Sequence, residues 1–201
     1  MTKIPVLDVR VIVAGFVMLT VWPSAQTGSF PVLDTITGRP PLNDDRRDWY
    51  SKHLGAMAES ALPTGPGETY RFLWLRTFDH PVVVRVTCIE KGCVLTALRT
   101  NGQGGYEAGS VVERKTRTMS DAEVRRFREM FGRVQFWRPQ PADDRLGLDG
   151  ARWILEVRRG QDYHLWDVWS PDASGAYAAY RELCLDLIRL SGLAVRQGRI
   201  Y

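Results

Sequence analysis

Alternating apolar and polar positions predict a β-hairpin in the C-terminal half of the chain. Residues 152–158 and 163–170 are strand-like and flank Gly160-Gln161, a pair that suits a type II′ turn because glycine accepts a positive φ. The turn sets a register with one apolar face, expected in the core: Trp153, Leu155, Val157, His164, Trp166 and Val168. The opposite face is predicted to be a half-solvated surface: Ile154, Glu156, Arg158, Tyr163, Leu165 and Asp167.

Similar patterns predict the other elements. An apolar stripe after Asn43 predicts a helix to about Ser60, and four strands follow within residues 70–117. A capping box that starts at Ser120 opens a second helix, and a last amphipathic helix ends at Gly192. The order α-β-β-β-β-α-β-β-α lacks βαβ alternation. We therefore expect a single α+β domain, with an antiparallel sheet of about six strands and helices packed mainly on one face.

The N-terminus has the order of a secretory signal. A basic segment with Lys3 and Arg10 precedes an apolar run at residues 11–22, and a small-residue stretch ends at Ala25. This run is too short for a comfortable membrane span, which needs about 20 residues. We expect residues 1–25 to be a signal peptide and the protein to be periplasmic or secreted. The alternative is a retained segment that anchors the domain in the inner membrane, facing the periplasm.

Cleavage would leave a mature chain that begins near Gln26. Residues 26–42, rich in Pro, Gly and Thr, are predicted to be an irregular lead-in to a domain at 43–195 with a tail at 196–201. The net charge of +4 becomes +3 without the signal segment, because 25 basic and 22 acidic side chains remain. This small excess is not concentrated in one patch, so we expect no nucleic-acid partner.

Export would place the three cysteines in an oxidising compartment. Cys88 and Cys93 lie in a strand–turn–strand pattern. A four-residue loop at 89–92 would set them opposite each other, within disulfide reach, whereas a three-residue loop at 90–92 would place them on opposite faces. We expect a Cys88–Cys93 disulfide, with Cys184 free and buried in a helix.

No motif indicates a metal or a cofactor. Two thiols without nearby His or Cys do not make a tetrahedral metal site. The glycine cluster at residues 101–105 lacks the Lys-Ser/Thr ending of a phosphate loop, and we expect it to be a flexible hairpin tip.

Candidate catalytic residues are few. Asp149, His164 and Asp167 form the only acid–histidine grouping that is close in sequence, and they define a hydrolase alternative. The predicted register, however, places His164 and Asp167 on opposite faces, where they cannot act as a pair. We interpret His164 as a core histidine bonded to the backbone and His53 as a satisfied structural histidine. We therefore expect no catalytic residues and no cofactor.

The outer face of the hairpin offers a binding surface instead. Trp and Arg are the residues found most often at interface hot spots. The predicted binding residues are Trp169, Asp167, Arg152 and Asp149. We expect a non-enzymatic binding protein whose partner is another envelope protein, and the sequence leaves the oligomeric state open.

Two motifs also carry a resemblance. The chain contains Asp149-Gly150-x-x-Trp153, followed by Tyr163-His164-x-x-x-x-Trp169-Ser170-Pro171. This motif pair resembles small, functionally uncharacterised exported proteins of proteobacteria, over roughly residues 69–193. The resemblance implies an exported, single-domain protein and supplies no activity and no site residues.

Overall fold

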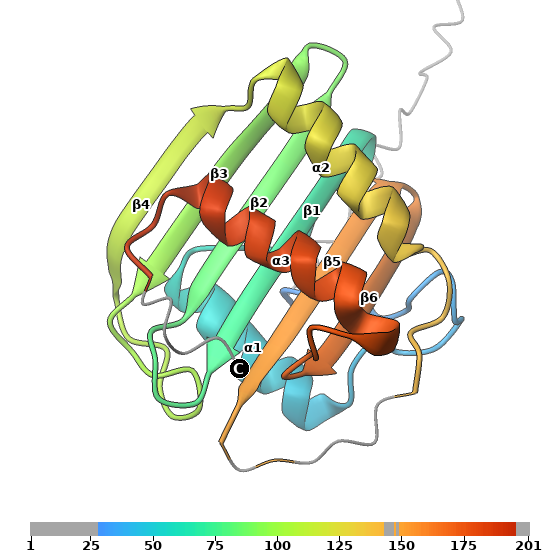
Figure 1. Cartoon of the computed structure of the whole chain (residues 1–201). Helices are drawn as coiled ribbons and strands as arrows, with labels where there is room; N and C mark the ends of the chain where they lie inside the picture. The colour runs from blue at the N-terminus through green and yellow to red at the C-terminus, as the bar shows by residue number, and fades with distance from the viewer. Residues whose placement is uncertain (1–27, 143–146, 148, 196–201) are drawn as a thin grey trace, which may run out of the picture.

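The computed structural model describes residues 28–142, 147 and 149–195. The predicted signal segment and the predicted tail lie outside these residues. Within them, six strands and three α-helices follow one another in the predicted order (Figure 1). The elements are α1 (Asp44–Ala56), β1 (Gly65–Arg76), β2 (Val82–Ile89), β3 (Gly92–Thr100), β4 (Val111–Thr118), α2 (Asp121–Val134), β5 (Ala151–Gly160), β6 (Asp162–Trp169), a 3-10 turn η1 (Gly175–Tyr177) and α3 (Ala178–Ser191).

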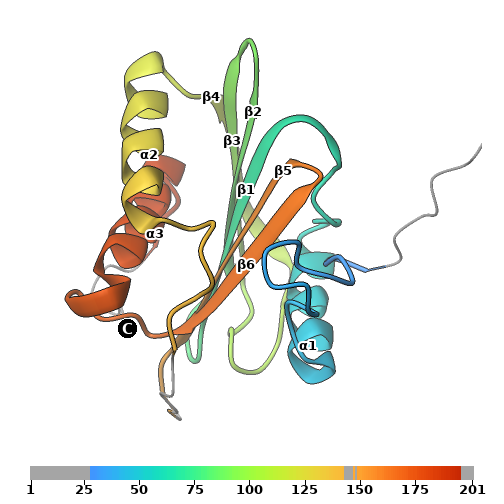
Figure 2. The same cartoon turned by 90° about the vertical axis from the view of Figure 1, so that its right-hand side faces the viewer.

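The strands form one antiparallel sheet in the order β4-β3-β2-β1-β5-β6, which confirms the predicted α+β fold. Helices α2 and α3 cover one face of this sheet, and α1 lies on the other together with the segment before it (Figure 2). Two of the three helices thus share a face, as expected. Strand β1 is central, so both of its faces are covered, and its residues from Tyr70 to Arg76 are all buried.

The predicted register of the β5–β6 hairpin is confirmed. Val157 lies opposite His164, Leu155 opposite Trp166 and Trp153 opposite Val168. Gly160 has a φ of +59°, as a type II′ turn requires at its first central position. The six residues of the predicted apolar face are all buried, on the side of the sheet that α2 and α3 cover.

The other face of this hairpin differs from the prediction of a half-solvated surface. Its six residues are all buried. Ile154, Tyr163 and Leu165 belong to a second core cluster with Tyr50 and Leu54 of α1. The charged residues on this face suggested contact with water, but Glu156 and Asp167 pair with arginines. Arg158 lies over the ring of Tyr163, with its guanidinium 5.1 Å from the ring centroid.

Arg71 of β1 is the centre of this buried ionic network. Its guanidinium lies 2.7 Å from Glu156 and 3.4 Å from Glu59, and it also donates to the carbonyl oxygen of Ser29 at 3.0 Å. Tyr163 donates to the second oxygen of Glu156 at 2.9 Å. Burial alone would lower the pKa of Arg71, but Glu156 and Glu59 raise it above its ordinary value, so this side chain remains charged.

Helix α1 ends four residues earlier than the apolar stripe predicts. Ala58, just after the helix, has a φ of +56°, which turns the chain out of the helical path. This turn directs Glu59 inward, where it accepts hydrogen bonds from Arg85 and Arg71. The predicted capping box of α2 is present, formed by Ser120 and Glu123.

Strand β6 is an edge strand whose outer side is covered by side chains. The N–H groups of Tyr163, Leu165 and Asp167 donate to Thr35 Oγ1, Asp34 Oδ2 and Gln140 Oε1 at 2.7, 3.1 and 2.8 Å. These contacts satisfy backbone groups that an uncovered edge would offer to another chain. The irregular segment before α1 is therefore packed on the sheet, although it contains no regular element.

Candidate functional site

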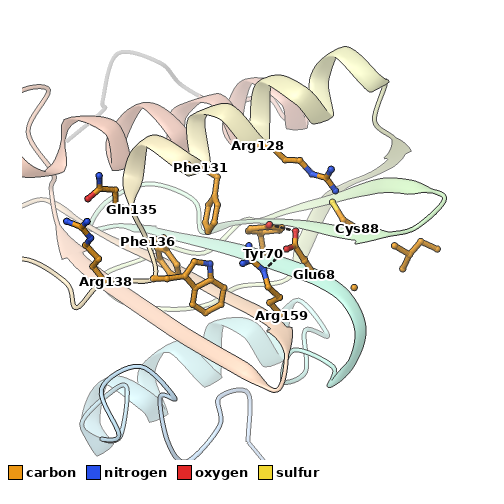
Figure 3. Close-up of a pocket in the computed structure, with 13 residues that line it drawn as sticks. Glu68, Tyr70, Cys88, Arg128, Phe131, Gln135, Phe136, Arg138 and Arg159 are labelled. Carbon is orange, nitrogen blue, oxygen red and sulfur yellow. Dashed lines mark hydrogen bonds and ion pairs between the residues drawn. The ribbon is translucent and has the colours of Figure 1, made fainter.

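Two of the cavities among the described residues open on opposite faces of the sheet. One has a volume of about 790 Å³ and lies between the C-terminal half of α2 and the ends of β1, β2 and β5; we call it the α2 groove (Figure 3). The other has a volume of about 450 Å³ and lies between α1, the ends of β1 and β6, and the loop before β4; we call it the α1 cleft. The predicted binding residues Arg152 and Trp169 line the α1 cleft.

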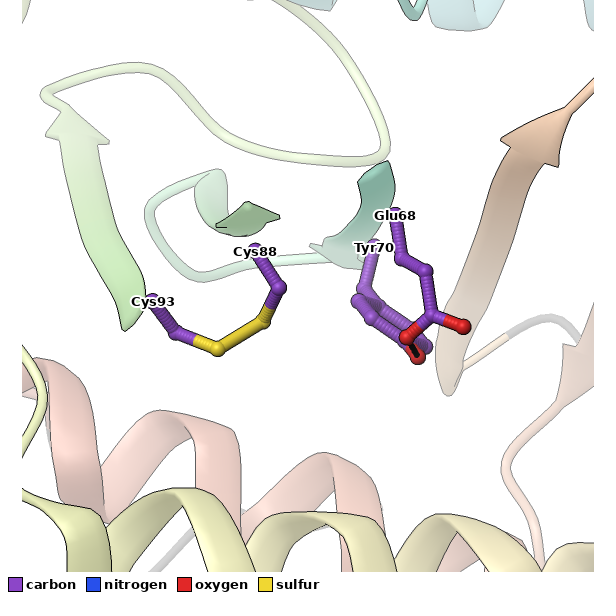
Figure 4. The surroundings of a disulfide bond; sticks show 4 residues. All are labelled: Glu68, Tyr70, Cys88 and Cys93. Atoms are coloured by element: carbon purple, nitrogen blue, oxygen red, sulfur yellow. Dashed lines mark hydrogen bonds between the residues drawn. A yellow bond between two sulfur atoms is a disulfide. The ribbon is translucent and has the colours of Figure 1, made fainter. Parts of the chain in front are cut away.

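The predicted disulfide lines the α2 groove. Cys88 and Cys93 pair directly across the β2–β3 hairpin, with their Cα atoms 4.1 Å apart, and their sulfur atoms are bonded. Figure 4 shows this bond near Glu68 and Tyr70 of β1, the strand next to β2. Ile89 pairs with Gly92, so the register is the one that sets the cysteines face to face. Cys184 is free and buried, as predicted.

Aromatic side chains from three separate segments surround the α1 cleft. Trp49 comes from α1, Tyr106 from the loop before β4 and Trp169 from the end of β6. Phe78, in the turn after β1, packs beside Tyr106 with the two rings tilted and their centroids 6.0 Å apart. Tyr106 is 57% exposed and Phe78 is 42% exposed. The sequence did not predict this cluster, because only Trp169 lies in the hairpin.

The loop that carries Tyr106 is packed against the sheet and is not the free tip that we predicted. The N–H of Gly104 donates to Asp79 O at 3.0 Å, and the N–H of Gly105 donates to Thr77 O at 3.1 Å. A Cβ atom on Gly104 would lie 2.6 Å from the carbonyl oxygen of Arg76. Glycine is needed here because the two backbones touch, and this contact fixes the position of Tyr106.

Trp169 is held in the same way. A Cβ atom on Gly147 would lie 2.5 Å from Trp169 Nε1, and one on Gly150 would lie 2.4 Å from Trp169 Cζ2. The indole ring therefore rests on the backbone of the loop before β5. Arg152, directly opposite on β5, places its guanidinium 5.0 Å from the centroid of the ring.

Asp167 lies beneath the cleft and is not the solvated residue that we predicted. Its side chain is 6% exposed. Tyr50 donates to it at 2.9 Å, Arg46 at 3.1 Å, and Arg152 Nη1 lies 3.6 Å away. Burial, and then the negative charge of Asp167, raise the pKa of Tyr50 well above its ordinary value, so Tyr50 remains a donor. Asp149 is exposed, and it does not line the cleft.

Replacing Asp167 by Asn is expected to lower the free energy of unfolding by about 1–3 kcal/mol, because two arginines lose their partner. Asp149→Asn is the matched control and is expected to change it by no more than about 0.5 kcal/mol. Urea denaturation of both variants measures the difference. Equal stability of the two proteins would contradict the role assigned to Asp167.

The three residues of the hydrolase alternative do not meet. His164 faces the side of the sheet covered by α2 and α3, while Asp167 faces α1. His164 Nδ1 lies 2.5 Å from Asp34 Oδ2, and Nε2 lies 2.9 Å from the carbonyl oxygen of Arg138. The predicted bond to the backbone is therefore present, together with a carboxylate partner from the segment before α1. Burial alone would raise the pKa of Asp34, but hydrogen bonds from His164 and Thr37 hold it below its ordinary value.

His53 differs from the prediction of a satisfied histidine. It is fully buried, and neither ring nitrogen has a hydrogen-bond partner among the described residues. Its ring packs edge-on against Trp49, with centroids 4.9 Å apart. Burial, and to a lesser extent the charge of Lys52, lower the pKa of His53 to about 4. The ring is therefore neutral at physiological pH.

No protein-family model matches this chain, and no curated protein sequence is similar to it. Within residues 28–142, 147 and 149–195, no group of three or more His, Cys, Asp or Glu side chains is arranged to hold a metal ion. The arrangement that remains is an aromatic, arginine-containing cleft whose side chains are fixed in place by the backbone beneath them.

Proposed function

We propose that this chain is a non-enzymatic binding protein of the cell envelope, which holds another protein at the α1 cleft. The observation that carries the proposal is the convergence of aromatic and arginine side chains around this cleft: Trp49, Phe78, Tyr106, Trp169, Arg46 and Arg152. Aromatic residues and arginine are enriched at protein–protein hot spots, because they bury large areas and also form directed polar contacts.

The shape of the site favours a protein as the occupant. Phe78 and Tyr106 project outward beside the cleft, with about half of their surface exposed. Such side chains can anchor in pockets of a partner, whereas a small molecule inside the cleft would leave Phe78, which does not line it, in water. The glycine contacts beneath Tyr106 and Trp169 hold these side chains in place before binding, which reduces the entropy lost on association.

Two features support a location outside the cytoplasm. The Cys88–Cys93 disulfide is typical of oxidising compartments. Residues 1–25 have the order of a secretory signal. In the part of the chain that the structure describes, no helix has the length and apolar character needed to span a bilayer.

A native N-terminus near Gln26 is expected by mass spectrometry, and one at Met1 in cytosolic protein would contradict export.

The binding proposal is tested by placing a photo-crosslinking amino acid at Tyr106 and, as a control, at Val94. Val94 is also exposed, but it lines neither cavity. The probe at Tyr106 is expected to crosslink one envelope protein that the probe at Val94 does not. The Phe78→Ser/Tyr106→Ser double variant is then expected to weaken binding of that purified protein at least about tenfold in calorimetry. The same affinity for this variant would exclude the cleft as the interface.

A further inference from the structure

We propose that the α2 groove is a second binding site, which takes a small aromatic carboxylate. The groove is distinct from the α1 cleft, because the two cavities share no residue and open on opposite faces of the sheet. Its volume of about 790 Å³ lies within the range of small-molecule sites, roughly 300–1,000 Å³.

The groove exists because of how α2 ends. Gln135 follows the helix with a φ of +53°, which turns the chain back across the sheet. The backbone of Arg138 is then fixed, because its carbonyl oxygen lies 2.9 Å from His164 Nε2 and 3.3 Å from Trp166 Nε1. The segment from Phe136 to Arg138 thus forms one wall of a cavity whose shape is set by these partly buried hydrogen bonds.

The inner surface of the groove is aromatic. The ring centroids of Tyr70 and Phe131 are 4.9 Å apart, those of Phe131 and Phe136 are 5.5 Å apart, and those of Phe136 and Trp137 are 6.0 Å apart. The Nε1–H of Trp137 is buried and has no acceptor among the described residues. Aromatic walls of this kind favour a flat ring that can pack against ring edges and faces over a flexible alkyl chain.

The charges of the groove favour an anion. Three arginines and one glutamate line it, which leaves two positive charges in excess: Arg128, Arg138, Arg159 and Glu68. Glu68 already has partners, since Arg159 lies 2.5 Å from it and Tyr70 donates to it at 2.6 Å. The guanidinium groups of Arg128 and Arg138 have no ion pair with any described residue. Figure 3 shows them toward opposite ends of the groove.

The aromatic walls and the excess positive charge of the groove together define the class of ligand. An aromatic body would fill the space between the rings, and a carboxylate would accept from a guanidinium that has no ion pair among the described residues. A cation would be repelled by the excess positive charge. A neutral aromatic compound would gain the ring contacts without the charge-assisted hydrogen bonds, so it should bind more weakly.

The test uses 2-naphthoate as the probe on the mature protein, with calorimetry as the readout. One molecule is expected to bind per chain. 2-Naphthalenemethanol, which has the same ring but no charge, is expected to bind roughly fivefold to tenfold more weakly, and dodecanoate more weakly than 2-naphthoate. Equal affinity for the neutral compound would overturn the anion assignment, and tighter binding of dodecanoate would overturn the aromatic one.

Matched variants locate the binding. Gly132 lines the groove on α2, and a Cβ atom there would meet nothing within 4 Å, so Gly132→Trp is expected to abolish binding without unfolding the protein. Gly55→Trp on α1 is the control, because Gly55 is equally open and remote from the groove. Unchanged binding by a folded Gly132→Trp protein would overturn the proposed site.

The arginines have a control of their own. The Arg128→Gln/Arg138→Gln variant is expected to weaken 2-naphthoate binding roughly fivefold to tenfold, and Arg114→Gln/Arg125→Gln to leave it unchanged. All four side chains are exposed, so each double variant loses two surface charges. An equal loss in both variants would show a general charge effect and contradict the site.

Discussion

Replacing Arg71 by Ala is expected to lower the free energy of unfolding by about 3–5 kcal/mol, enough to unfold many domains of this size. Arg71 is fully buried between Glu156 and Glu59. Its removal takes an ionic partner from two carboxylates that are buried away from water. Urea denaturation at neutral pH measures the change.

Arg85→Ala is the matched control for this prediction. Arg85 also pairs with Glu59, at 3.1 Å, but about a third of its side chain is exposed, so water can replace it and the expected loss is about 1 kcal/mol or less. The Arg71→Met/Glu156→Gln double variant is expected to recover part of the loss seen in Arg71→Ala, because less buried charge remains uncompensated. A loss under about 1 kcal/mol in Arg71→Ala would contradict the network.

Acidification from pH 6.5 to pH 4 is expected to remove roughly 2–3 kcal/mol of stability through His53 alone. The pKa of His53 is lowered to about 4 in the folded protein, while the unfolded chain takes up a proton near the ordinary value of 6.5. Between these values the unfolded state binds more protons, so stability falls as the pH falls. The Asp34 carboxyl contributes at lower pH, because its folded pKa lies below its ordinary value.

The measurement compares thermal or urea unfolding across this pH range. His53→Leu is expected to flatten the decline, whereas His80→Gln, which changes an exposed histidine, should keep it. His53→Leu should also be at least as stable as the native protein at pH 7, because it removes buried nitrogens that have no hydrogen-bond partner among the described residues. The same slope in the native and His53→Leu proteins would rule out this role of His53.

Much of the fold could be predicted because its signals are local. The turn at Gly160 sets the register of the β5–β6 hairpin, and the capping box at Ser120 marks the start of α2. The Cys88–Cys93 pair follows from its own short hairpin. The burial of the second sheet face could not be predicted, because it depends on pairs such as Arg71 and Glu156, which are 85 residues apart.

The residues of the candidate site also fall into two groups, those that a local pattern predicts and those that no local pattern predicts. Arg152 and Trp169 are cross-strand neighbours, so the hairpin register alone predicts that they lie together. Trp49, Phe78 and Tyr106 come from other segments, and no periodic pattern links them to the hairpin. Phe78 and Tyr106 are single aromatic residues in loops, and Trp49 lies on α1. Such residues are too common to identify a site. The α2 groove was missed for the same reason.

The covered edge of β6 has a consequence for how the protein folds. Leu165 N–H bonds to Asp34 across a sequence separation of 131 residues, so this edge closes only when the two ends of the domain meet. Contacts of such separation form late and slow the folding of a chain. A chain exported N-terminus first would hold residue 34 outside long before residue 165 arrives. Slower formation of hydrogen-exchange protection at Leu165 than at Leu73 during refolding would show this order, and simultaneous protection would contradict it.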